Sequence, residues 1–84
     1  MGSSLHNQRD APANGAFAVT PSDSADLPRA IRGFYVGGAG DVKVTTLDST
    51  VVTFVAVPVG QIMPVSCDRI WQNGTTATSI VGLY

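Results

Sequence analysis

The residue types that perform most enzyme chemistry are scarce in this chain. Its 84 residues include one His, one Cys, six Asp and no Glu. A nucleophilic Cys needs a neighbouring His and an oriented pocket. His6 lies in a polar N-terminal segment, far along the chain from Cys67, which the sequence favours as a small buried core residue. The sequence therefore predicts no catalytic residues and a protein that is not an enzyme.

Two further patterns suggest ligand binding, and both have a simpler structural interpretation. Asp23 and Asp26 share one loop and could hold a hard cation, but Asp is more often used to cap turns. Residues 37–40 are glycine-rich, yet a phosphate-binding loop needs a helix after its glycines. Here a strand-like segment follows, so we expect a tight hairpin connection over residues 37–41 with glycines at positive φ. No metal or cofactor is predicted.

Composition excludes two classes of partner. The formal net charge is -1 and only 13% of the residues are charged, so the chain is a poor polyanion binder and no nucleic acid is expected. No apolar run approaches the ~20 residues that span a membrane, so no membrane partner is expected. The first residues lack the basic and apolar regions of a secretory signal, and the single Cys suits synthesis in a reducing cytoplasm.

The elements that must position any site are predicted to be strands behind an N-terminal arm. Residues 1–16 are small and polar without periodicity, which predicts an extended arm that could reach a neighbouring subunit, and residues 17–84 form a single β domain. Eleven Val and eight Thr favour strands. Five are expected, and a sixth if residues 16–20 are counted; the others cover residues 31–36, 42–47, 50–57, 62–71 and 75–84. Their spacing predicts a small antiparallel β-sandwich, jelly-roll-like, or a barrel.

One predicted strand points to assembly. Residues 50–57 are apolar on both faces, so both faces need a cover. Either a second subunit provides it, or the strand lies centrally beneath the domain's own loops. A domain of this size without disulfides or metal is marginal alone, which favours oligomerisation. The residues predicted to make interfaces are two arginines beside the Pro28 turn, three aromatic residues and one strand valine: Arg29, Arg32, Tyr35, Val55, Trp71 and Tyr84.

A family resemblance covers about residues 19–84. Asp26-Leu27-Pro28, the run from Arg32 to Asp41 (RGFYVGGAGD), and the downstream run Thr75-Thr76-Ala77-Thr78 resemble the head spike base proteins of gene transfer agents and related tailed phages. Val52-Thr53-Phe54, Gly60, Pro64-Val65 and the final Leu83-Tyr84 follow the same pattern. Relatives tend to have an Asp-Gly turn where this chain has Asp48-Ser49.

The resemblance implies a virion structural protein on the outer capsid surface, made in the cytoplasm of a bacterial host. It would serve as a head spike base or cement protein. Its implied partners are the major capsid protein, copies of itself in a trimer or pentamer, and a spike or fibre protein. Two alternatives stay open: a tail, neck or baseplate component, and a carbohydrate-binding adhesin module with Trp71 and Tyr35 as its platform.

Overall fold

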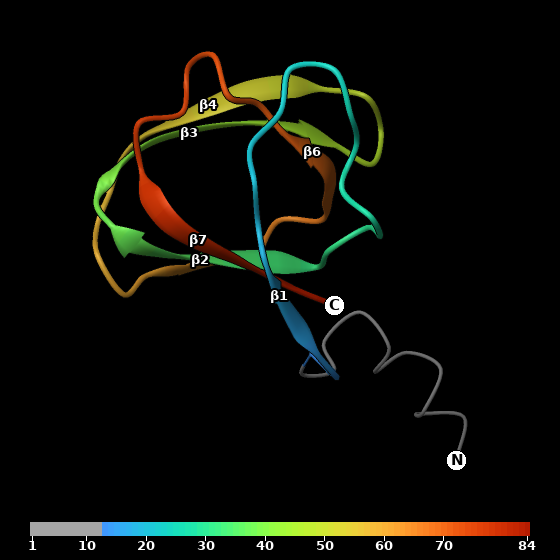
Figure 1. Cartoon of the computed structure of the whole chain (residues 1–84), viewed down its shortest axis with the longest axis horizontal. Helices are drawn as coiled ribbons and strands as arrows, with labels where there is room; N and C mark the ends of the chain where they lie inside the picture. Colours follow the sequence, from blue (N-terminus) through green and yellow to red (C-terminus); the bar gives the residue numbers. More distant parts are fainter. Residues whose placement is uncertain (1–12) are drawn as a thin grey trace.

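The protein is a sandwich of two antiparallel sheets (Figure 1). The computed structural model describes residues 13–84, which contain seven strands and no helix. The strands are β1 (Ala16–Ala18), β2 (Gly33–Gly38), β3 (Gly40–Thr46), β4 (Val51–Val57), β5 (Ile62–Met63), β6 (Cys67–Ile70) and β7 (Thr78–Leu83). One sheet has the order β1-β7-β2-β5 and the other β4-β3-β6. The predicted all-β antiparallel fold is confirmed. No helix among the described residues is long and apolar enough to cross a membrane.

The core fills the space between the sheets with alternate strand residues. Phe34 and Val36 of β2 and Val42 and Val44 of β3 are alternate residues that point inward and are inaccessible to solvent. Each buried side chain of this size contributes about 1.5–3 kcal/mol. The largest fully buried side chains are Phe34, Ile31, Ile70, Val36, Val42, Val44 and Cys67. The prediction of a buried Cys67 is confirmed.

The N-terminal strand is tied to the C-terminal end of β7. β1 begins at Ala16 and pairs with β7, and the amides of Asn14 and Gly15 donate to the Tyr84 carbonyl at 2.6 and 3.2 Å. Residues 1–12, which make up most of the predicted arm, lie outside the described residues. The division into an arm over residues 1–16 and a domain over residues 17–84 therefore stays a prediction.

The predicted hairpin connection over residues 37–41 is wrong. β2 extends through Gly38, β3 begins at Gly40, and the two strands belong to different sheets. Neither Gly38 nor Gly40 has positive φ; in residues 13–84 the positive-φ glycines are Gly60 and Gly74. A Cβ on Gly40 would lie 2.6 Å from the Ala77 amide nitrogen, and one on Gly38 would clash with Thr78 Oγ1. The glycines are needed because residues 76–79 pass too close for a side chain.

The predicted strand over residues 62–71 is divided into two. Pro64 has no amide hydrogen, and Val65 N donates to Met63 O at 2.9 Å in a tight turn. β5 therefore ends in the four-stranded sheet and β6 begins in the other sheet. The Asn73-Gly74 turn is confirmed, with Gly74 at φ 104°, but it joins β6 to β7 in different sheets and so closes no hairpin.

The apolar strand β4 lies at the edge of its sheet. Within residues 13–84 it pairs with β3 alone. The loop over residues 47–50, which includes the predicted Asp48-Ser49 turn, connects the two strands. The alternative that this strand is central is wrong, because a central strand would have a partner on each side. Most of its side chains are exposed, and Val55 is 73% accessible.

Candidate functional site

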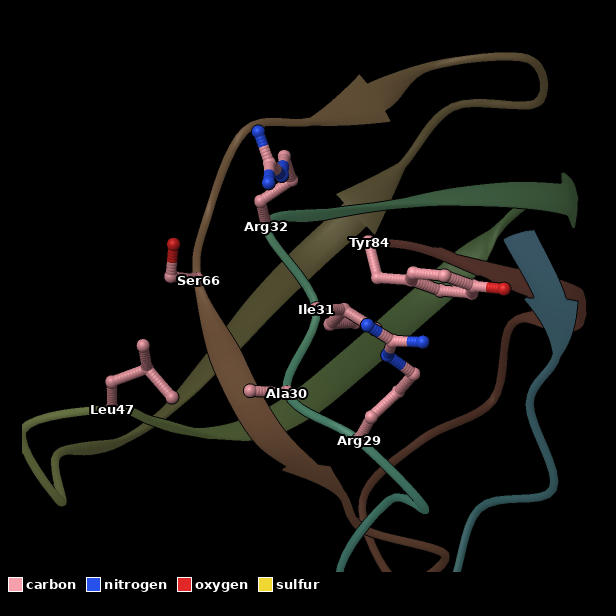
Figure 2. Close-up of a pocket in the computed structure, with 7 residues that line it drawn as sticks. All are labelled: Arg29, Ala30, Ile31, Arg32, Leu47, Ser66 and Tyr84. Carbon is pink, nitrogen blue, oxygen red and sulfur yellow. The ribbon is translucent and has the colours of Figure 1, made fainter. Parts of the chain in front are cut away.

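The described part of the chain has an open hollow at one end of the sandwich. It has a volume of about 480 Å³. Its walls come from the segment before β2, from the residues that directly follow β3 and β7, and from the residue before β6. Figure 2 shows the side chains that surround it. Its lining residues are Arg29, Ala30, Ile31, Arg32, Leu47, Ser66 and Tyr84.

One wall of this hollow is an arginine stacked on an aromatic ring. The Arg29 guanidinium carbon lies 3.7 Å from the centroid of the Tyr84 ring, an arrangement visible in Figure 2. The other side of Tyr84 is supported by Phe17 of β1, with the ring centroids 5.9 Å apart. This cation–π contact and the aromatic stack hold the guanidinium in one orientation.

Two cationic side chains line the hollow. Arg29 and Arg32 line it, and none of its seven lining residues is acidic. The backbone of Arg32 is fixed by a hydrogen bond from its amide to Leu83 O at 2.7 Å. Guanidinium groups present planar sets of donors that suit carboxylates. Chemically, the hollow can receive an acidic side chain or another small anionic group.

A second candidate surface is the outer face of the β4-β3-β6 sheet. Trp71 follows β6 and donates from Nε1 to Thr45 Oγ1 at 2.9 Å. Lys43 Nζ and Arg69 Cζ lie 4.9 and 5.0 Å from its ring centroid. Trp71 is therefore held by two cations and one hydroxyl on a face that also carries the side chains of Val51 and Val55.

The two loop aspartates are used for structure. Asp23 Oδ1 accepts hydrogen bonds from the amides of Gln72 and Asn73 at 3.0 and 2.8 Å. Asp26 forms a 2.8 Å ion pair with Arg69. The sequence interpretation that Asp caps a turn is supported for Asp23, whereas Asp26 pairs with Arg69.

The exposed apolar side chains gather in one stretch of the chain. All six large hydrophobic residues that are exposed in residues 13–84 fall between positions 47 and 62. This stretch includes the β3–β4 loop, the edge strand β4 and the edge strand β5. The residues are Leu47, Val51, Val52, Val55, Val59 and Ile62. Four of them lie on these two edge strands and two lie in the adjoining loops, and such exposed apolar edges are typical of an interaction surface.

A third surface is the outer face of the four-stranded sheet. Tyr35 is half-buried there and lies opposite Ile62 on one side and Val81 on the other. Alternation along β2 and β7 places Gly33, Gly37, Ser79 and Leu83 on the same face, together with Ala16 and Ala18 of β1. These positions carry no charged residue.

Cys67 has the properties of an inert core thiol. Burial, reinforced by the neighbouring Asp68 carboxylate, raises the pKa of this thiol to about 12. The thiolate, which is the reactive form, is therefore scarce at neutral pH. The described residues contain no group of three or more potential metal ligands.

The structure separates the six predicted contact residues into three places. Arg29, Arg32 and Tyr84 meet in the hollow, although Tyr84 is more than fifty positions from both arginines. Val55 and Trp71 share the outer face of the β4-β3-β6 sheet, and Tyr35 lies on the other sheet.

Sequence reasoning missed three exposed apolar residues, Leu47, Val59 and Ile62. A signal was present for two of them. Leu47 adjoins the Asp48-Ser49 turn and Val59 stands between Pro58 and Gly60, where turn segments are usually polar.

One comparison with known proteins identifies a relative. No known family model matches this sequence, and no curated protein matches it. A chain of the solved structure described as the capsid of a native gene transfer agent (GTA) particle, computed with C5 symmetry, matches with 34% identity and a TM-score of 0.81. The match covers 92% of this chain and 89% of that chain. The chain therefore belongs to the family of that capsid protein and is a virion structural protein of the gene transfer agent and phage capsid type.

Proposed function

We propose that this protein decorates the outer surface of the capsid, where it binds the major capsid protein and self-associates as a head spike base or cement protein. The observation that carries the proposal is the likeness, over almost the whole chain, to a protein of a gene transfer agent capsid. The exposed surfaces support it, since six large apolar side chains are exposed within residues 47–62 and exposed apolar surface of this kind marks interaction sites.

The hollow is the proposed contact with the shell. Two arginines and no acid line it, and the Tyr84 ring keeps Arg29 oriented before binding. A carboxylate from the major capsid protein would form charge-assisted hydrogen bonds there. Many copies on one repetitive shell would add avidity to a contact that is weak in isolation.

Self-association on the shell would use surfaces outside the hollow, in a trimer at threefold positions or a pentamer at vertices. The related capsid structure was computed with C5 symmetry, which is compatible with a fivefold position. A spike or fibre protein on top of such a ring is the third proposed partner. The arm, residues 1–16, is proposed to strengthen attachment by crossing onto a neighbour.

The test is co-sedimentation of the purified protein with capsid shells that lack it. We expect binding that weakens as salt rises, and loss of binding in Arg29→Gln. Lys43→Gln is the matched control, because it removes one positive charge on a different face. A folded protein that ignores shells, or equal effects of both substitutions, would contradict the proposed contact. A truncation of residues 1–12 should fold normally and bind shells more weakly.

The alternatives make different predictions. A tail, neck or baseplate component would bind capsid-free tails in the same assay. For the adhesin alternative, the structure places Trp71 and Tyr35 on different sheets, so they do not form one platform. Lys43 and Arg69 also lie within about 5 Å of the Trp71 ring centroid, where a sugar would have to stack.

A further inference from the structure

The edges of the two sheets are protected very unequally. The free edge of β6 is covered by the segment before β2: Ser22 N donates to Ile70 O, Leu27 N donates to Asp68 O, and Ile31 bridges to Cys67. The edge strands β1 and β5 are only three and two residues long. β4 has seven residues, no charge and no proline, and no described segment pairs with its outer side.

The hydrogen-bond pattern shows which backbone N–H and C=O groups of β4 do not bond to β3. Thr46 N donates to Thr50 O at 2.8 Å, so these two residues form a hydrogen-bonded pair. Such pairs alternate along an antiparallel ladder, and the next ones are Val44 with Val52 and Val42 with Phe54.

The residues between these pairs face away from β3. The N–H and C=O groups of Val51 and Thr53 therefore point to the free edge. An unpaired row of this kind is a template for another strand. Their side chains lie on the outer face of the sheet with that of Val55.

The free stretch has defined ends and is symmetric about its middle. The stretch begins at Val51, directly after the β3–β4 loop. It ends at Val55, because the next residue, Ala56, has φ 58° and donates its amide to Asp41 Oδ1 in a bulge. The midpoint of these five residues is Thr53. An antiparallel copy of the same stretch, related by a twofold axis through Thr53, would place Val51 opposite Val55 of the copy and Thr53 opposite its own equivalent.

That pairing is chemically self-complementary. β-Branched side chains directly opposite each other pack well, and two opposed threonines can share a hydrogen bond. No like charges face each other, because the stretch has no charge. On the inner face, the half-exposed Val52 would meet Phe54 of the copy. A closed twofold contact would also protect the edge from open-ended aggregation.

We propose that β4 is a pairing edge for a second copy of this chain, joined antiparallel about Thr53 into one continuous six-stranded sheet. The contact uses only this edge, which contributes no residue to the lining of the arginine hollow. It goes beyond the proposed capsid role and does not depend on it.

The first test is the concentration-dependent mass of the full chain, measured by light scattering and sedimentation. For the free chain, in the absence of shells, we expect a dimer whose dissociation constant rises at least about tenfold in Thr53→Lys, which places two like charges opposite each other. Val59→Lys is the control, because it adds the same charge to an exposed valine off the strand. A chain that stays monomeric at every concentration, or equal weakening by both substitutions, would overturn the proposal.

The second test determines which residues of the two copies lie opposite each other, and it does not depend on a loss of binding. Thr53→Cys should give a disulfide-linked dimer on mild oxidation, because its equivalent lies directly opposite. Val51→Cys and Val55→Cys should not cross-link alone, since equivalent residues would lie ~13 Å apart, but their mixture should. The buried Cys67 should take no part. Cross-linking of Val51→Cys by itself would refute the twofold register.

The experiments can reject the capsid role or the β4 pairing without rejecting the other proposal. A Thr53→Lys monomer that still co-sediments with shells would leave the capsid role intact. A wild-type dimer with the stated cross-links that ignores shells would leave the β4 pairing intact.

Discussion

The Arg29 guanidinium carbon lies 3.7 Å from the centroid of the Tyr84 ring, which is itself stacked on Phe17. This relationship joins the segment before β2 to the end of β7 and to β1. It sets the shape of the charged hollow before any partner arrives.

Replacing Tyr84 tests the structural part of this stack. Tyr84→Leu should lower the free energy of unfolding by about 1–2 kcal/mol, because it removes one aromatic stack and one cation–π contact. Tyr84→Phe keeps both contacts and should stay within about 0.5 kcal/mol of wild type. Urea unfolding followed by tryptophan fluorescence measures both. Equal losses in the two variants would show that the hydroxyl group, and not the ring, matters.

Gly38 should be sensitive to any side chain, for a reason unrelated to φ. A Cβ at this position would clash with Thr78 Oγ1 of the paired strand β7. Gly38→Ala should therefore lower stability by about 1–3 kcal/mol, as overpacking does. The double variant Gly38→Ala/Thr78→Ala should recover most of the loss in thermal unfolding. If the double variant is no more stable than Gly38→Ala, the loss does not come from a clash with the Thr78 side chain.

Ser49 offers a stabilising change. It holds φ at 72° in the β3–β4 loop, a conformation that is unfavourable for a residue with a Cβ. Ser49→Gly should raise the free energy of unfolding by up to about 1 kcal/mol, because glycine adopts positive φ without a steric cost. Ser24→Gly, where φ is not positive, should give no gain. Thermal unfolding of the two variants side by side measures the difference.

Asp48 should make the same loop sensitive to acid. Side-chain hydrogen bonds from Thr46, and then from Thr50, hold the pKa of Asp48 below its ordinary value. Because the folded pKa is lower than the unfolded one, the stabilising contribution is present above the unfolded pKa and is lost as pH falls through the folded pKa. Wild type should therefore lose stability relative to Asp48→Asn as pH drops below about 4. Parallel pH dependences for the two proteins would contradict this.

Cys67 should behave as a reporter of unfolding. With its pKa raised to about 12 by burial, the native thiol should resist thiol reagents at pH 8 and react only when the protein opens. The folded state holds the neutral thiol, so its contribution to stability is complete below the unfolded pKa. That contribution falls as pH rises from about 8.5 towards 12. Labelling rates with and without urea measure the protection; fast labelling of the native protein would be inconsistent with the buried position.

Several features of this protein could be read from short windows of its sequence. The alternation along residues 42–47 predicted β3, because burial on a sheet has a period of two residues and is encoded locally. The β-branched run over residues 50–57 predicted β4. Asn73-Gly74 predicted a positive-φ turn, and Asp23 predicted a turn cap, since each depends on the local backbone. The absence of a His near Cys67 along the chain, together with the usual burial of free cysteine, predicted a buried thiol.

The tertiary structure alone decided which strands are neighbours. Residues 37–41 have the composition of a hairpin turn, but their glycines exist because residues 76–79 pass close by, and that approach is set nearly forty positions away. The edge position of β4 likewise depends on which strands pair with β3. The meeting of Arg29, Arg32 and Tyr84 also required the whole sandwich. Local periodicity determines which residues form strands, whereas strand partners and surface sites depend on contacts between distant segments, which no local pattern records.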